Sequence, residues 1–171
     1  MVRVILGLGG NVGGTQRLFA DCLARLAADG RVVATSRLWR TRAVGPPQDD
    51  FLNTAAVIDW PAGPHDLFAR CQELERAAGR QRSREERWGP RTLDLDLLLT
   101  KGLVCRGPSL EIPHPRFHDR RFALEPATEV APDWTHSLIG RTIRELVEDA
   151  REREPEAILE VRNFEFSILS S

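Results

Sequence analysis

The order of apolar patterns along the chain is the feature that most constrains its fold. Four segments have the composition of strands: 2–8, 31–40, 51–60 and 93–100. Two segments with apolar residues at helical spacing separate them, one from Thr15 to Gly30 and one that ends at Gly79. The order βαββαβ predicts an α+β fold, with a ferredoxin-like antiparallel sheet and both helices on one face. Later segments must cover the opposite face, or that face must bind a ligand.

The remainder of the chain predicts smaller elements around this core. We expect a short hairpin over 103–111 and a short helix around 119–131, which ends before Pro132. Thr142 and Glu145 have the spacing of a capping box and predict the start of a further helix. Residues 157–169 predict one or two strands. Because no repeat or linker divides the sequence, we expect a single domain over 1–171.

Composition excludes several classes of function. The net charge of −1 gives no overall field that would recruit nucleic acid or an anionic membrane, so any anion site must be local. The three cysteines are far apart and form no C-x-x-C pair, which argues against zinc. The apolar run at the N-terminus is too short for a signal peptide, and no run has transmembrane length. These features predict a cytoplasmic protein.

Two aspartates interrupt the apolar strand at 93–100. Side chains alternate across a strand, so Asp94 and Asp96 point to one face while Leu93, Leu95 and Leu97 point to the other. Adjacent carboxylates repel each other, and a hard divalent cation such as Mg²⁺ relieves that repulsion. A solvated sheet face with two ordinary aspartates is the alternative interpretation of this pattern.

The loop just before this strand is rich in arginine. Residues 80–91 hold five arginines against two glutamates, and glycine and proline interrupt regular structure there. Taken alone, the loop fits either a solvated charged segment or an anion site, since guanidinium groups bind phosphate oxygens bidentately. Next to the paired aspartates, it favours a polyphosphate that is bound together with Mg²⁺.

The segment RWGPRTLDLDLLL (87–99) closely resembles the signature of the 6-hydroxymethyl-7,8-dihydropterin pyrophosphokinase family of folate biosynthesis. Collinear similarities lie at 6–11 (LGLGGN), 40–57 and 112–132, so the resemblance spans about residues 2–150. It implies transfer of a diphosphate from ATP to the hydroxymethyl group of the pterin, with release of AMP. It also implies two Mg²⁺ ions, ATP as co-substrate, and neither a nucleic acid nor a membrane partner. We expect a monomer.

The resemblance also assigns roles to individual residues. It implies that Asp94 and Asp96 hold the metal ions. The residues implied in catalysis are Arg80, Arg82, Arg91, Asp94 and Asp96. The implied nucleotide contacts are Gln72, Glu75, Arg82, Arg87, Trp88, Ile112, His114 and Arg120. The implied pterin contacts are Thr41, Val44, Phe51, Asn53, Trp88, Asp94 and Phe122, with the two phenylalanines stacking on the ring and Asn53 reading its edge.

Some features depart from the family pattern. Gly10 stands where the family usually has serine, and a longer loop leaves open whether Arg80 or Arg82 acts on the phosphates. The tail 151–171 has no clear counterpart, and it could add an edge strand, pair with another subunit or cover the sheet. Two other functions are weighed against the kinase. One is a non-catalytic RNA-binding ferredoxin-like module, and the other is a metal-dependent nuclease or phosphatase that uses D-x-D.

Overall fold

The computed structural model describes residues 1–80 and 89–166 of the chain. Its elements, in chain order, are β1 (Val2–Gly10), α1 (Thr15–Asp29), β2 (Arg31–Thr35), β3 (Leu38–Thr41), β4 (Phe51–Trp60), α2 (Pro64–Ala77), β5 (Asp94–Thr100), β6 (Cys105–Arg106), β7 (Glu111–Ile112), the 3₁₀ turn η2 (Phe117–Asp119), α3 (Arg121–Val130), α4 (Ile143–Arg153) and β8 (Ile158–Arg162). None of the helices in the described ranges is long and apolar enough to cross a membrane.

One antiparallel sheet organises the molecule. Its strands lie in the order β5-β1-β4-β3-β8, and β2 also pairs with β4. The predicted βαββαβ core and the short hairpin, formed by β6 and β7, are confirmed. The single strand predicted over 31–40 is wrong, because it breaks into β2 and β3 at Ser36. There the Ser36 hydroxyl accepts the Ala55 amide at 2.9 Å and replaces a regular ladder bond.

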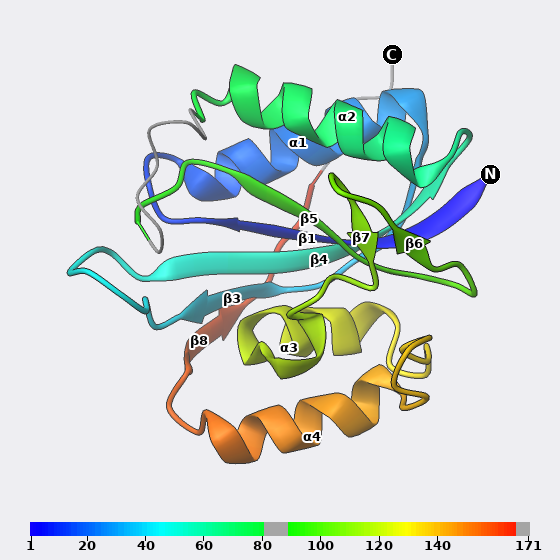
Figure 1. The fold of residues 1–171 in the computed structure, drawn as a ribbon. Coiled ribbons are helices and arrows are strands. Elements are labelled where there is room, and N and C mark those ends of the chain that lie inside the picture. Colours follow the sequence, from blue (N-terminus) through cyan, green and yellow to red (C-terminus); the bar gives the residue numbers. More distant parts are fainter. Residues whose placement is uncertain (81–88, 167–171) are drawn as a thin grey trace.

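Helices cover both faces of the sheet, and each pair has its own hydrophobic core. Helices α1 and α2 pack on one face, and α3 and α4 pack on the other (Figure 1). Leu93, Leu95 and Leu97 belong to the first core, as the alternation of the strand predicts. The second core includes Leu124 of α3 and Val147 of α4. Since α3 covers only part of its face, the paired aspartates are left beside an open pocket.

The capping box that was predicted at Thr142 and Glu145 is confirmed. The Thr142 hydroxyl accepts the Glu145 amide at 3.3 Å, and the Glu145 carboxylate accepts the Thr142 amide at 2.7 Å. Because both bonds satisfy amides that have no partner within the helix, they fix the first turn of α4.

Glu125 of α3 is 2% exposed and lies between two arginines. Arg121 donates to it at 2.9 Å, and Arg151 of α4 donates to both of its oxygens at 2.9 and 2.7 Å. Burial opposes ionisation of Glu125, yet these two guanidinium groups hold its pKa below the ordinary value. The Arg151–Glu125 ion pair therefore ties α4 to α3.

We expect Glu125→Gln to lower the free energy of unfolding by about 2 to 4 kcal/mol at pH 7, because it leaves two arginines facing a neutral amide. The folded-state pKa of Glu125 is depressed, so its contribution is present above the unfolded value of about 4.3 and is lost as pH falls through the folded value. Urea unfolding at pH 7 and pH 3 measures this. The matched control is Glu148→Gln, which removes an exposed partner of Arg151 and should cost less than about 1 kcal/mol. Equal losses in both variants would contradict the prediction.

Residues 158–162 of the tail form an edge strand, which was one of the three roles left open for it. Strand β8 pairs with β3, with Trp39 opposite Val161 and Arg40 opposite Glu160. Arg40 also donates to the Glu160 carboxylate at 3.1 Å. The 157–169 segment thus contributes one strand within the described residues.

Candidate active site

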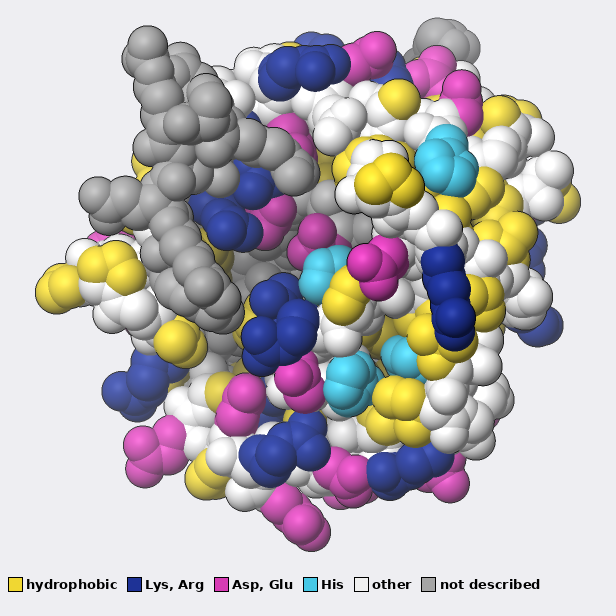
Figure 2. Space-filling model, in the orientation of Figure 1, with side chains coloured by type: hydrophobic (Ala, Val, Ile, Leu, Met, Phe, Trp, Pro, Cys, Tyr) yellow, Lys and Arg dark blue, Asp and Glu magenta, His cyan; other side chains and the backbone are white. Residues whose placement is uncertain are grey.

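A pocket opens beside the paired aspartates, at the end of the sheet that α3 leaves uncovered. Its volume is about 130 Å³. Figure 2 shows basic and acidic side chains gathered around a hollow in the middle of this face. The lining comes from the ends of β1, β3, β4 and β5, from the loops beside them and from the start of α3: Gly9, Thr41, Arg42, Val44, Phe51, Asn53, Gly89, Arg91, Asp94, Asp96, Arg120 and Phe122.

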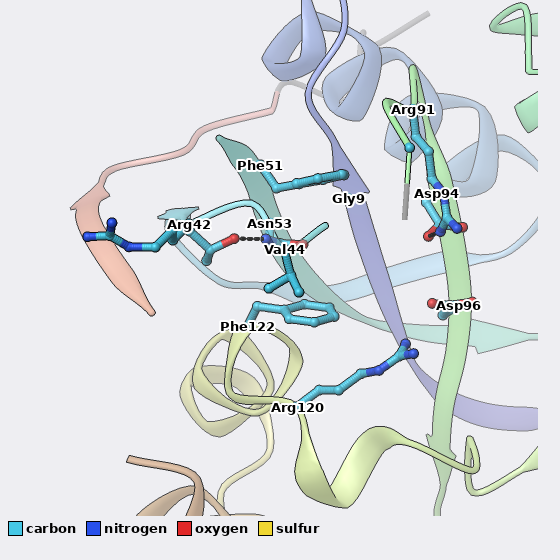
Figure 3. Close-up of a pocket in the computed structure, with 12 residues that line it drawn as sticks. Gly9, Arg42, Val44, Phe51, Asn53, Arg91, Asp94, Asp96, Arg120 and Phe122 are labelled. Carbon is cyan, nitrogen blue, oxygen red and sulfur yellow. Dashed lines mark hydrogen bonds and ion pairs between the residues drawn. The ribbon is translucent and has the colours of Figure 1, made fainter. Parts of the chain in front are cut away.

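One half of the pocket is a slot between two aromatic rings. Phe51 comes from β4 and Phe122 from α3, and their side chains approach from opposite sides with Asn53 between them (Figure 3). Asn53 donates through Nδ2 to the Thr41 hydroxyl at 2.8 Å, and this bond fixes the orientation of its amide. A Cβ atom at Gly9 would lie 3.0 Å from Asn53 Oδ1, so a glycine there leaves room for that oxygen. The slot suits a flat ring with a hydrogen-bonding edge.

The other half of the pocket is charged. Asp94 accepts from Arg80 at 2.5 Å and from Arg91 at 2.6 Å. Although burial opposes ionisation, the two guanidinium groups hold the pKa of Asp94 below its ordinary value. Asp94 is therefore a carboxylate at neutral pH.

Asp96 has a different environment on the same face of β5. Burial and the charge of Asp94 together raise the pKa of the Asp96 carboxyl to about 7. Arg120 extends from the start of α3 toward Asp96 (Figure 3). Burial, the largest effect on Arg120, lowers the pKa of its guanidinium. Asp96 thus lies where a further cation would relieve its repulsion from Asp94.

A second hollow adjoins the first and shares Asp96 with it. Its volume is about 240 Å³, and its lining includes Phe68 of α2, Leu97 of β5, the 107–111 hairpin segment and His114. His114 Nε2 lies 3.9 Å from Asp96 Oδ1. Burial, followed by the charge of Arg120, lowers the pKa of His114 to about 4, so its ring is neutral at pH 7. His114 Nδ1 accepts the Arg116 amide at 3.2 Å, which assigns the proton to Nε2, on the side of Asp96.

Glu75 and Arg80 form a buried support behind the carboxylates. Glu75 is 2% exposed, and its Oε1 accepts from Arg80 at 2.7 Å and from the Leu95 amide at 2.8 Å. The bond to Leu95 joins α2 to β5, and the bond to Arg80 holds that guanidinium against Asp94. The structure therefore places Glu75 behind the site and not on the surface of either hollow.

Asn11 links two loops at the rim of the pocket, a role that sequence reasoning missed. Its Oδ1 accepts the Arg91 amide at 2.8 Å, and its Nδ2 donates to the Asp49 carbonyl at 2.8 Å. Gly10 allows this close approach, because a Cβ atom there would lie 2.6 Å from the Thr92 carbonyl oxygen. The asparagine at the end of LGLGGN is the sequence signal that could have indicated a role for Asn11.

The structure brings most of the predicted pterin residues together. Thr41, Val44, Phe51, Asn53 and Phe122 line one pocket with Asp94, Asp96, Arg91 and Arg120. Of the predicted nucleotide residues, His114 lines the second hollow, whereas Gln72 is half-buried on α2 and Ile112 is buried in the first core. Arg82, Arg87 and Trp88 lie outside the described residues, so the choice between Arg80 and Arg82 stays a prediction.

The donor set fits a hard cation that takes part of its coordination from elsewhere. Within residues 1–80 and 89–166, no group of three or more His, Cys, Asp and Glu side chains could hold a metal ion. Among the described residues, Asp94 and Asp96 are the two carboxylates that line the pocket. Mg²⁺ is bound in this way, with phosphate oxygens and water completing an octahedron, whereas structural zinc needs more protein ligands.

Comparisons with known proteins identify the fold and the family of this chain. Wild-type Plasmodium falciparum HPPK-DHPS matches the fold with a TM-score of 0.65 at 14% identity, over 91% of this chain and 45% of that one. The chain thus spans less than half the length of that solved structure. A Methylorubrum extorquens protein named 2-amino-4-hydroxy-6-hydroxymethyldihydropteridine pyrophosphokinase is 42% identical over 148 residues, which cover 85% of this chain and 91% of that protein.

A Synechocystis protein with the same name is 39% identical over 146 residues, which cover 84% of this chain and 74% of that protein. The RNA-binding alternative finds no support among these relatives. Residues 5–132 match the family model of 7,8-dihydro-6-hydroxymethylpterin-pyrophosphokinase, HPPK. That range of this chain contains Phe51, Asn53, Asp94, Asp96 and Phe122. The chain belongs to the 7,8-dihydro-6-hydroxymethylpterin-pyrophosphokinase family.

Proposed function

We propose that this chain transfers the β,γ-diphosphate of ATP to the hydroxymethyl group of 6-hydroxymethyl-7,8-dihydropterin, a step of folate biosynthesis. The products are the pterin diphosphate and AMP, and the reaction depends on Mg²⁺. The observation that carries this proposal is the position of Asp96, which borders both the aromatic slot and the second hollow. A pterin in the slot and ATP in the hollow would meet at the two carboxylates.

The pterin is assigned to the slot by its chemistry. Phe51 and Phe122 offer ring faces on both sides, and Asn53 offers an amide whose orientation Thr41 fixes. Such a pocket binds a flat heterocycle and reads its donor and acceptor pattern. The charged half of the pocket then lies beside the hydroxymethyl group of the pterin.

Asp94 and Asp96 would hold Mg²⁺ together with phosphate oxygens. The family resemblance implies two such ions. When bound, the metal would neutralise phosphate charge and make the pterin hydroxyl easier to deprotonate. The protein itself orients the reactants, so that the hydroxyl oxygen faces the β-phosphorus in line with the departing AMP oxygen.

The arginines would bind the charge that develops on the phosphates. Arg91 is 30% exposed and shares Asp94 with Arg80, so it is able to exchange that carboxylate for a phosphate oxygen. Arg80 is 5% exposed and is held by Glu75, so it stays in place and keeps Asp94 oriented. Arg120, between the slot and Asp96, completes the positive surface.

We expect removal of Mg²⁺ with EDTA to abolish AMP formation from ATP and the pterin, because two carboxylates without metal would repel the triphosphate. Chromatography should show one AMP for each pterin diphosphate when Mg²⁺ is restored. Isothermal titration with a non-hydrolysable ATP analogue provides the matched measurement of binding. AMP formation that persists in EDTA would disprove the metal assignment, and phosphate release without a pterin would favour the phosphatase interpretation.

A further inference from the structure

The segment between α4 and β8 connects the two walls of the aromatic slot. The first wall is formed by Thr41, Arg42 and Phe51 on the β3–β4 side, and the second by Phe122 on α3. Residues 154–157 lead from the end of α4 to β8, and residues 158–162 form β8 beside β3 (Figure 1). Together they make the segment 154–162. This segment, which we name the tail clip, belongs to the part of the chain without a counterpart in the family resemblance.

One end of the tail clip is attached to the second wall. Arg121 Nη1 donates to the Glu154 carbonyl at 2.7 Å and to the Pro155 carbonyl at 2.9 Å. Arg121 directly precedes Phe122, and its side chain is only 14% exposed. Its Nε donates to the buried Glu125 carboxylate at the same time, which leaves the guanidinium little freedom.

The other end is attached to the first wall. The Ala157 carbonyl accepts the Arg42 amide at 2.9 Å, and Ile158 pairs with Thr41, the residue that orients Asn53. Farther along, Arg40 donates to Glu160 of β8 at 3.1 Å and to Asp50 at 3.0 Å. Because Asp50 directly precedes Phe51, Arg40 links Glu160 of β8 to the residue next to the stacking ring.

We propose that the tail clip sets the width of the pterin slot, and that Arg121 is a positioning residue for pterin binding. This inference rests on the proposed function. Arg121 touches neither hollow and acts through Phe122 and the 154–155 carbonyls. Stacking falls off steeply when ring separation changes, so a shift of either wall weakens pterin binding first. The nucleotide hollow is built from α2, β5 and the 107–115 segment, and it has no contact with the tail clip.

Steady-state kinetics of matched variants test this role. Arg121→Ala should raise KM for the pterin about tenfold, with kcat and KM for ATP within about twofold of the unaltered protein. Arg121→Lys, which keeps one donor for the carbonyls, should recover part of that loss. Glu160→Lys acts from the other end, since it places a like charge against Arg40, and should raise KM for the pterin about threefold.

Arg151→Ala is the control. Arg151, like Arg121, donates to Glu125, but it makes no bond to residues 154–155. It should lower the melting temperature while KM for the pterin stays unchanged. An equal rise of KM in Arg151→Ala would overturn the inference, because general loosening of α3 and α4 would then suffice. Unchanged KM for the pterin in both Arg121→Ala and Glu160→Lys would overturn it as well.

Hydrogen exchange separates failure of this inference from failure of the proposed function. The Arg42 amide is bonded to Ala157, so amides of 41–44 should exchange faster in Arg121→Ala and not in Arg151→Ala. If the unaltered protein formed no AMP, the proposed function would fail, while this readout would still decide whether Arg121 holds the first wall. Unchanged exchange of the 41–44 amides in Arg121→Ala would overturn the proposal that the tail clip holds the first wall.

Discussion

Asp96→Asn should lower kcat for AMP formation by about a thousandfold, equivalent to about 4 kcal/mol, while the folded protein becomes more stable. The loss follows because an amide oxygen carries no charge for Mg²⁺ at the point where both hollows meet. The gain follows because burial and the charge of Asp94 raise the pKa of Asp96 to about 7. That ionised carboxyl destabilises the metal-free fold increasingly as pH rises from the unfolded pKa toward 7.

Melting curves without Mg²⁺ measure the gain in stability of Asp96→Asn. At pH 8, Asp96→Asn should melt at least about 2 °C higher than the unaltered protein. The difference should shrink toward pH 5 and vanish below the unfolded pKa of about 3.9, where Asp96 is protonated in both the folded and the unfolded chain. Asp119→Asn removes a neighbouring carboxylate that pairs with Arg116, and it should change neither kcat nor this pH dependence. Near-normal turnover in Asp96→Asn would contradict the assignment of Asp96 as a metal ligand.

Asn53→Leu should lower kcat/KM for the pterin by about a hundredfold or more, with KM for ATP unchanged. Leucine keeps the volume of the side chain but presents no donor or acceptor to the ring edge. A buried polar edge that loses its partner carries the full cost of its desolvation. Initial rates at saturating ATP, with the pterin varied, measure this effect.

Thr41→Val separates the amide of Asn53 from its orientation. The variant keeps Asn53 but removes the hydroxyl that accepts its Nδ2 at 2.8 Å. We expect a loss of about tenfold in kcat/KM for the pterin, smaller than that of Asn53→Leu. If Asn53→Leu retained normal pterin kinetics, the slot would have to bind its ring by stacking alone.

Periodicity was sufficient to predict the core of the fold. The alternation of Leu93, Leu95 and Leu97 with two aspartates set the faces of β5, and helical spacing located α1 and α2. The break at Ser36 could not be predicted, because it depends on a hydroxyl that reaches across to β4. Local propensity contains no record of such a contact between distant segments.

Site residues were predicted to different extents for the same reason. The aspartates follow from strand alternation beside an arginine-rich loop, the aromatic pair follows from the family resemblance, and the structure brings them into one pocket. Glu75 lies behind Arg80 because an interior bond to the Leu95 amide holds it there, which no spacing along α2 encodes. Asn11 was missed because its partners, Asp49 and Arg91, are close only after the sheet has formed.

The position of Asp96 between two hollows has a thermodynamic consequence. Any ligand that changes the charge or protonation of this carboxyl changes the affinity of the neighbouring hollow for its own ligand. Linkage is reciprocal, so the factor by which ATP alters pterin affinity must equal the factor by which the pterin alters ATP affinity. One shared side chain would thereby couple the ligands proposed for the two hollows.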